Sequence, residues 1–230
     1  MNGIYVNSLI CFLASLSCLF TAWFIYKNNR QDYVEVSYAS FWFFAGASWL
    51  FFAASLVLFK IGKIDASLFL NQYIVQTFAF AQVVSVSYFV FQRIINSKKI
   101  VSWIFYLYCL FFVIGLYFNY QPGTVYLTVS SNYSFQYAIS NTYWIIFQWP
   151  FVGMVMATVI DFFKNFYYWF KRGDLFDHKY LFTSFAIIIY AMIGYLEQSG
   201  LTATWVSELF RIAIIFCAYI AYFAYKNKEI

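Results

Sequence analysis

Seven long runs of apolar residues follow one another along the chain, separated by short polar segments. Each run is long enough to cross roughly 30 Å of hydrocarbon as a helix that rises about 1.5 Å per residue. The runs are continuous instead of alternating between apolar and polar positions, which favours helices over the strands of a barrel. We therefore expect an all-α integral membrane protein, a single seven-helix domain over residues 1–230, with spans at Ile4–Tyr26, Ser37–Phe59, Ala66–Gln92, Ile100–Phe118, Tyr143–Phe166, Tyr180–Gln198 and Thr202–Tyr225.

The first run has the pattern of a retained helix. It lacks the basic leading segment of a signal peptide, and Lys27 and Arg30 follow it directly. We expect it to stay in the membrane as the first span.

The uncharged segment 119–142, between the fourth and fifth spans, predicts a short β-hairpin. Val125, Leu127 and Val129 alternate with their neighbours before a Ser-Ser-Asn cluster, and Tyr133, Phe135 and Tyr137 do so after it. This period-two pattern around turn-forming residues is typical of paired strands. A lone hairpin is only marginally stable, so we expect it to pack on the mouth of the bundle. Both a lid over a pocket and a cap on helix ends fit this pattern.

The basic residues orient the bundle. With the N-terminus outside, eleven of the 14 Lys and Arg residues fall on the inner side, only Lys60 and Lys63 fall outside, and Arg211 lies within the last span. Positive charge concentrates on the cytoplasmic side of membrane proteins. The sequence therefore predicts a multi-pass protein of a plasma or inner membrane, with its N-terminus outside and its C-terminus inside.

Composition agrees with a membrane protein and narrows the chemistry. Hydrophobic residues make up 64% of the chain and charged residues 10%, against about a quarter charged in soluble domains. The four cysteines lie inside apolar runs without a Cys-x-x-Cys pair, and His178 is the one histidine. Structural zinc, histidine-ligated haem and a histidine-based triad are therefore not expected. We expect no enzyme activity, no metal, no cofactor and no nucleic-acid partner, and we expect the lipid bilayer and a further membrane protein as partners.

Two charges interrupt the last apolar run, in the stretch WVSELFRIAIIF. A charge at mid-bilayer costs at least about 2.5–3.5 kcal/mol, so it requires a partner or water. Glu208 and Arg211 are three residues apart, and a helix places such residues on one face. We expect the two side chains to lie within pairing distance.

Further polar residues are predicted at the same depth, in the outer half of the bundle. Gln148 precedes Pro150, a residue that removes a backbone donor and bends a helix. Two interpretations stay open: hydrogen bonds between helices, or a water-accessible pocket for a small ligand with a carboxylate or hydroxyl groups. The predicted ligand-binding residues are Gln72, Gln76, Gln148, Tyr195, Glu197, Glu208 and Arg211.

Asp161 lies near the inner end of the fifth span, with Lys164 one helical turn further on. This spacing is typical of an interfacial ion pair whose lysine reaches toward the headgroups. A proton-relay role for Asp161 is the alternative.

The pattern of the spans resembles one family of sensors. A covalent retinal is excluded, because the last span contains no lysine for the Schiff base. The stretches SYASFWFFAGASWLFFAASL, VSYFVFQRII and FFKNFYYWFKRGDLFDHKYLFTSFAIII are similar to the seven-helix sensor region at the N-terminus of many bacterial histidine kinases. This chain departs from that family because no kinase part follows the last span. The resemblance implies a sensing bundle that would signal through a separate partner.

Three functions are therefore weighed. The first is a stand-alone membrane sensor or ligand-binding protein that uses the predicted polar residues of the outer half. The second is a structural or accessory subunit of a larger membrane complex. The third is a small-solute transporter, although the first and last three spans show no internal repeat.

Overall fold

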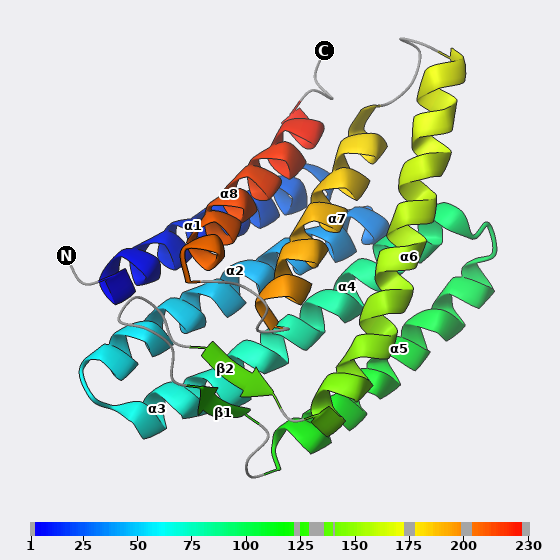
Figure 1. The fold of residues 1–230 in the computed structure, drawn as a ribbon. Coiled ribbons are helices and arrows are strands. Elements are labelled where there is room, and N and C mark those ends of the chain that lie inside the picture. The colour runs from blue at the N-terminus through cyan, green and yellow to red at the C-terminus, as the bar shows by residue number, and fades with distance from the viewer. Residues whose placement is uncertain are drawn as a thin grey trace.

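Within the described part of the chain, seven helical segments are long and apolar enough to cross a membrane, and they run side by side in one bundle (Figure 1). The computed structural model describes residues 3–121, 125–128, 136–139, 141–172, 178–198 and 204–226. Within these ranges the side chains of both strands and of residues 141–145, 172, 197–198, 204–205 and 207 are not described. The elements are α1 (Gly3–Asn29), α2 (Tyr33–Lys60), α3 (Ile64–Phe69), η1 (Leu70–Val75), α4 (Gln76–Ile94), α5 (Lys98–Asn119), β1 (Val125–Thr128), β2 (Gln136–Ile139), α6 (Asn141–Arg172), α7 (His178–Gln198) and α8 (Thr204–Lys226).

These helices coincide with the seven predicted spans, and most of them continue past the apolar runs into charged residues. Helix α2 begins at Tyr33, four residues before its predicted span, because Asp32 caps it. The Asp32 carboxylate accepts hydrogen bonds from the backbone N–H groups of Val34 and Glu35, which have no partner within the helix. The cap therefore places Glu35 inside the first turn of α2.

The helices form a closed ring of neighbours. Successive contacts join α1 to α2, α2 to α4, α4 to α5, α5 to α6, α6 to α7 and α7 to α8, and α8 returns to α1. The largest fully buried side chains come from α2 and α4, among them Tyr38, Trp42, Phe80 and Phe89. The core therefore lies along these two helices, in the middle of the ring.

Most Lys and Arg residues lie at one end of the bundle, where α1, α4, α6 and α8 finish and α2, α5 and α7 begin. We call this the basic end. It corresponds to the side that the sequence predicts to face inward.

The third span is a continuous helical segment built from α3, η1 and α4. Its middle part, Leu70–Val75, is a π-helix, in which each backbone hydrogen bond spans one more residue than in an α-helix. The wider turn leaves backbone carbonyls available to other groups. One of them, that of Gln72, accepts a hydrogen bond from the Asn119 side chain of α5.

The loop between the fourth and fifth spans contains two short strands across the end of the bundle opposite the basic end (Figure 1). They pair antiparallel, with Val125 opposite Ile139 and Thr128 opposite Gln136. Strand β1 contacts α3, and β2 contacts α7. Residues 129–135, which include the predicted turn, lie outside the described residues.

Candidate functional site

Two of the predicted ligand-binding residues, Gln72 and Gln76, are buried where η1 meets α4. The Gln72 amide donates hydrogen bonds to the backbone oxygens of Asn119 (2.8 Å) and Gln121 (3.0 Å). The Asn119 amide returns a hydrogen bond of 2.6 Å to the Gln72 carbonyl. Gln76 Oε1 is buried and has no hydrogen-bond partner among the described residues. Gln72 thus fastens the third span to the end of α5.

Arg211 lies elsewhere, where α8 meets α1 and α2. It is buried, donates a hydrogen bond to Oδ1 of Asn7 in α1, and its guanidinium lies 5.0 Å from the centre of the Phe52 ring in α2. Glu208, one turn earlier, is half-buried. Ion pairs between described residues join Arg93 to Asp161 and Lys179 to Glu35, not Glu208 to Arg211. Arg211 therefore has a direct partner, Asn7, that the sequence pattern did not indicate.

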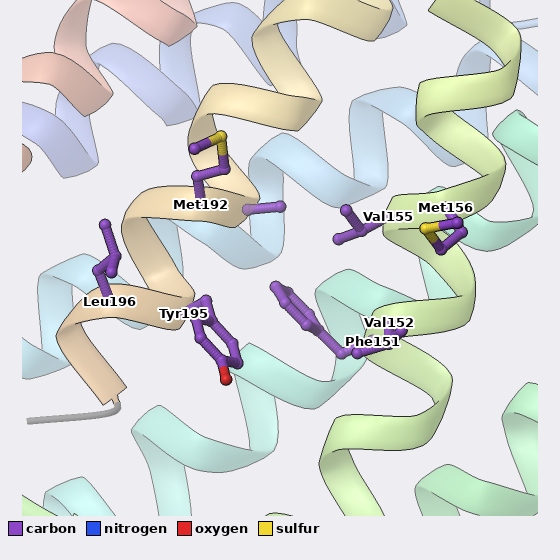
Figure 2. Close-up of a pocket in the computed structure, with 8 residues that line it drawn as sticks. Phe151, Val152, Val155, Met156, Met192, Tyr195 and Leu196 are labelled. Atoms are coloured by element: carbon purple, nitrogen blue, oxygen red, sulfur yellow. The ribbon is translucent and has the colours of Figure 1, made fainter.

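The remaining predicted residues lie on α6 and α7. The Tyr195 ring faces that of Phe151 in α6, with 6.4 Å between ring centres, and both rings line a cavity between the two helices (Figure 2). Gln148 is half-buried on α6. The side chain of Glu197 is not among those that the structure describes. The contacts described here do not unite the predicted set in one hydrogen-bond network. A shared pocket for these side chains stays a prediction.

The most concentrated buried charge lies instead at the basic end, in two neighbouring clusters. The first joins α2, α7 and α8 through the carboxylate of Glu35. Lys179 Nζ donates to Glu35 Oε1, and the Tyr225 hydroxyl donates to Oε2. All three residues are only 4% exposed. Both carboxylate oxygens therefore have a donor, and the buried negative charge has a counter-ion.

The second cluster joins α4, α6 and α7 through the carboxylate of Asp161, which is 1% exposed. Arg93 forms an ion pair of 2.8 Å with Asp161 Oδ2, and the Ser184 hydroxyl donates to the same oxygen at 2.6 Å. The Asn165 amide donates to Oδ1 at 3.0 Å. Arg93 also donates to the Thr183 hydroxyl oxygen at 3.0 Å. Charge-assisted hydrogen bonds of this kind are among the stronger ones in proteins.

Aromatic rings pack against the two clusters and connect them. The Arg93 guanidinium lies 4.8 Å from the centre of the Phe89 ring and 4.4 Å from that of Tyr180, within cation–π range. The fully buried Tyr38 ring stacks on Phe89 at 4.5 Å and on Tyr225 at 5.8 Å. Such an apolar surrounding strengthens each paired charge and makes an unpaired one more costly.

The partner of Asp161 differs from the one that the sequence suggests. Lys164, one turn further on, is exposed, and its ammonium donates to the backbone carbonyl of Arg93 at 2.8 Å. The side chain of Arg93 takes the position beside the carboxylate. Asp161 is thus part of a contact between three helices and not of an interfacial pair within α6.

Sequence reasoning missed Glu35, Arg93 and Lys179 because they lie just beyond the ends of the apolar runs. Glu35 precedes its predicted span by two residues, and Arg93 and Lys179 adjoin theirs. One signal was available: Glu35 shares a helix face with Tyr38, three residues later, at an end otherwise rich in positive charge. An acidic residue there has basic neighbours from several helices.

A third polar contact lies between the ends of the bundle and joins α2, α4 and α7. Trp49 Nε1 donates to the Tyr190 hydroxyl at 3.2 Å, and that hydroxyl donates to Gln82 Oε1 at 2.9 Å. Tyr190 also packs edge-on against Phe41 and Trp42. Helix α7 is therefore held to the core at a second level.

The described residues contain no group of three or more His, Cys, Asp or Glu side chains that could hold a metal ion. No family model, no curated protein and no solved structure matches this chain. The function is therefore argued from the geometry alone.

Proposed function

We propose that the protein is a seven-helix sensor of a plasma or inner membrane, in which the two ion-pair clusters at the basic end form a switch that is read by a separate protein partner. The observation that carries this proposal is the pairing of four charged side chains from α2, α4, α6 and α7 inside the bundle, where Glu35, Asp161 and Lys179 are buried and the Arg93 side chain is 9% exposed.

The free energy needed to bury charged side chains argues for a role beyond holding the helices together. Removing two charges from water costs several kcal/mol per ion, and well-packed apolar residues often stabilise a site as well or better. Ionisable residues within membrane bundles are therefore commonly tied to function. The two cations also lie against aromatic rings, Arg93 against Phe89 and Tyr180 and Lys179 against Tyr180 and Tyr225, which supports the switch.

The position of α7 supports a coupled switch. This one helix carries residues of both clusters on successive turns. Lys179 belongs to the first cluster, and Thr183 and Ser184, one turn later, belong to the second. A displacement or rotation of α7 would change both clusters together. Packed ionic contacts of this kind hold discrete arrangements, which is what a two-state element requires.

The test measures distances between spin labels at the basic end, in lipid nanodiscs. Labels on Cys residues introduced at Ile100 of α5 and His178 of α7 suit this, because both positions are exposed and α5 belongs to neither cluster. The four native cysteines are replaced by serine. Asp161→Asn and Glu35→Gln each remove one buried negative charge and nearly preserve shape. Asp65→Asn, at an exposed position in α3 away from both clusters, is the matched control.

We expect one narrow distance distribution for the unmodified clusters and for Asp65→Asn. We expect a second distribution, shifted by several ångströms, for Asp161→Asn and Glu35→Gln in a bundle that stays folded by circular dichroism. One unshifted distribution in both cluster variants would reject the switch. Solute flux through reconstituted liposomes that the Asp161→Asn substitution abolishes would identify a transporter instead.

A further inference from the structure

Between α6 and α7 lies a cavity of about 270 Å³, lined by four residues from each helix (Figure 2). Phe151 and Tyr195 face each other across it, while Met156 and Met192 lie further along the two helices toward the basic end. Ala191 leaves room on the α7 side. The site is separate from both ion-pair clusters.

The two walls are held apart by contacts on their far sides. Tyr108 of α5 donates a hydrogen bond of 3.0 Å to the carbonyl oxygen of Pro150, which ties α6 toward α5 at the level of the cavity. Tyr190 ties α7 toward α2 and α4 through Trp49 and Gln82. Both walls of the cavity are therefore anchored to neighbouring helices.

The lining defines the chemistry of the occupant. Among the described residues that line it there is no charged side chain, and Tyr195 supplies the one polar side chain. Met156 and Met192 at the mouth are 58% and 57% exposed within membrane-spanning segments, so the cavity opens toward hydrocarbon. The volume lies just below the roughly 300–1,000 Å³ of pockets for drug-sized molecules, which suits one slender chain.

We propose that this cavity binds one acyl chain of a bilayer phospholipid, which enters from the membrane between α6 and α7. The mouth lies in the membrane-spanning parts of α6 and α7, and an apolar void beside hydrocarbon gains contacts when a chain fills it. The flexible side chains of Met156 and Met192 adapt to a chain without a fixed shape. The proposal does not depend on the sensor function, because it concerns occupancy alone.

The test uses a phospholipid with a photoreactive diazirine in one acyl chain, at low mole fraction in nanodiscs of unlabelled phospholipid. Peptide mass spectrometry then compares labelling at the cavity with labelling at Val113 of α5, an apolar position that is 61% exposed on a bare helix face. Val155→Trp fills the cavity, and Met192→Trp fills it from the other wall. Val113→Trp is the matched control for added bulk on the lipid-facing surface.

We expect labelling of α6 and α7 at the cavity at least about threefold above that at Val113, lost in both filling variants and retained in Val113→Trp. Equal labelling at both places, or labelling that survives in both filling variants, would overturn the proposal. Competition by a free fatty acid but not by added phospholipid would also overturn it and assign the cavity to a single-chain amphiphile. None of these outcomes bears on the spin-label distances that test the sensor.

Discussion

Single charged residues at the ends of the apolar runs determine how this bundle is joined. A charge in the first or last turn of a membrane helix can reach headgroups and water, or it can turn inward to an opposite charge. Glu35 and Lys179 turn inward and meet, although neither lies in a predicted span. Hydropathy places such residues near the interface, but it contains no information about which way they point.

Asp161 allows the inward pairing to be tested at one residue. Arg93→Met leaves the Asp161 carboxylate buried without a counter-ion, which typically costs about 3–5 kcal/mol. Lys164→Met removes an equal charge from an exposed side chain, and exposed contacts contribute about 1 kcal/mol or less. We therefore expect unfolding of purified protein in bicelles, titrated with sodium dodecyl sulfate, to show a much larger loss of stability for Arg93→Met. Equal losses would mean that Asp161 depends on Lys164.

The predicted ligand-binding residues show what a sequence pattern can and cannot supply at this scale. Burial of Gln72 and Arg211 follows from hydrocarbon solvation, and both residues are buried. The hydrogen-bond partners of these residues cannot be predicted in the same way. The depth of a residue along the helix axis does not determine which neighbouring helix its side chain faces. Gln72 reaches α5, whereas Arg211 reaches α1.

Small, specific contacts at particular positions along the helix axes hold the helices of this protein together. Helix caps, the π-helical turn of η1 and glycine contacts determine where along the helices these contacts lie. Only the caps can be predicted from local sequence. Asp32 is such a cap, and it is a local signal for the early start of α2 that the apolar pattern, which placed the second span at Ser37, did not include. The π-turn packs against α2 and is hydrogen-bonded to the end of α5, and the apolar pattern of the third span did not indicate these contacts.

The contact between η1 and α5 gives a prediction for one element pair. Asn119→Ala removes the hydrogen bond to the Gln72 carbonyl, and interhelical hydrogen bonds in membranes contribute on average about 0.6 and at most about 1.7 kcal/mol. We expect a loss of that size in the free energy of unfolding. Gln121→Ala is the control, because its backbone oxygen still accepts from Gln72. A loss in Gln121→Ala equal to that in Asn119→Ala would contradict the assignment.

The close approach of α1 and α2 gives a second element-scale prediction. A Cβ atom at Gly46 would lie 2.6 Å from Leu19 Cγ and 3.1 Å from the Leu19 backbone nitrogen. Gly46→Ala should therefore destabilise the protein by about 1–3 kcal/mol through overpacking. At Gly194 of α7 a Cβ meets nothing within 4 Å, so Gly194→Ala should be neutral or stabilise by up to about 1 kcal/mol. Thermal unfolding followed by tryptophan fluorescence compares the two, and similar melting temperatures would contradict the close approach.

The described part of the chain forms a closed ring of seven helical spans, in which α7 connects both charge clusters to the core. The number of spans could be predicted from the sequence, because hydrocarbon requires long apolar helices whatever their neighbours. The order of neighbours could not, because the apolar runs resemble one another and each could face lipid or protein. The placement of paired charge at the basic end emerges only when the ring is assembled.

A double-mutant cycle on Glu35 and Lys179 tests most directly whether buried charges join the helices at the basic end. The free energy of unfolding in bicelles is measured for Glu35→Gln, Lys179→Met and the double variant. The coupling energy is the difference between the stability change of the double variant and the sum of the changes of the two single variants. Residues in direct contact couple by about 0.5–3 kcal/mol. We expect a value in the upper half of that range, with the double variant more stable than Lys179→Met alone. A coupling energy near zero, with additive losses, would show that these charges do not pair inside the bundle.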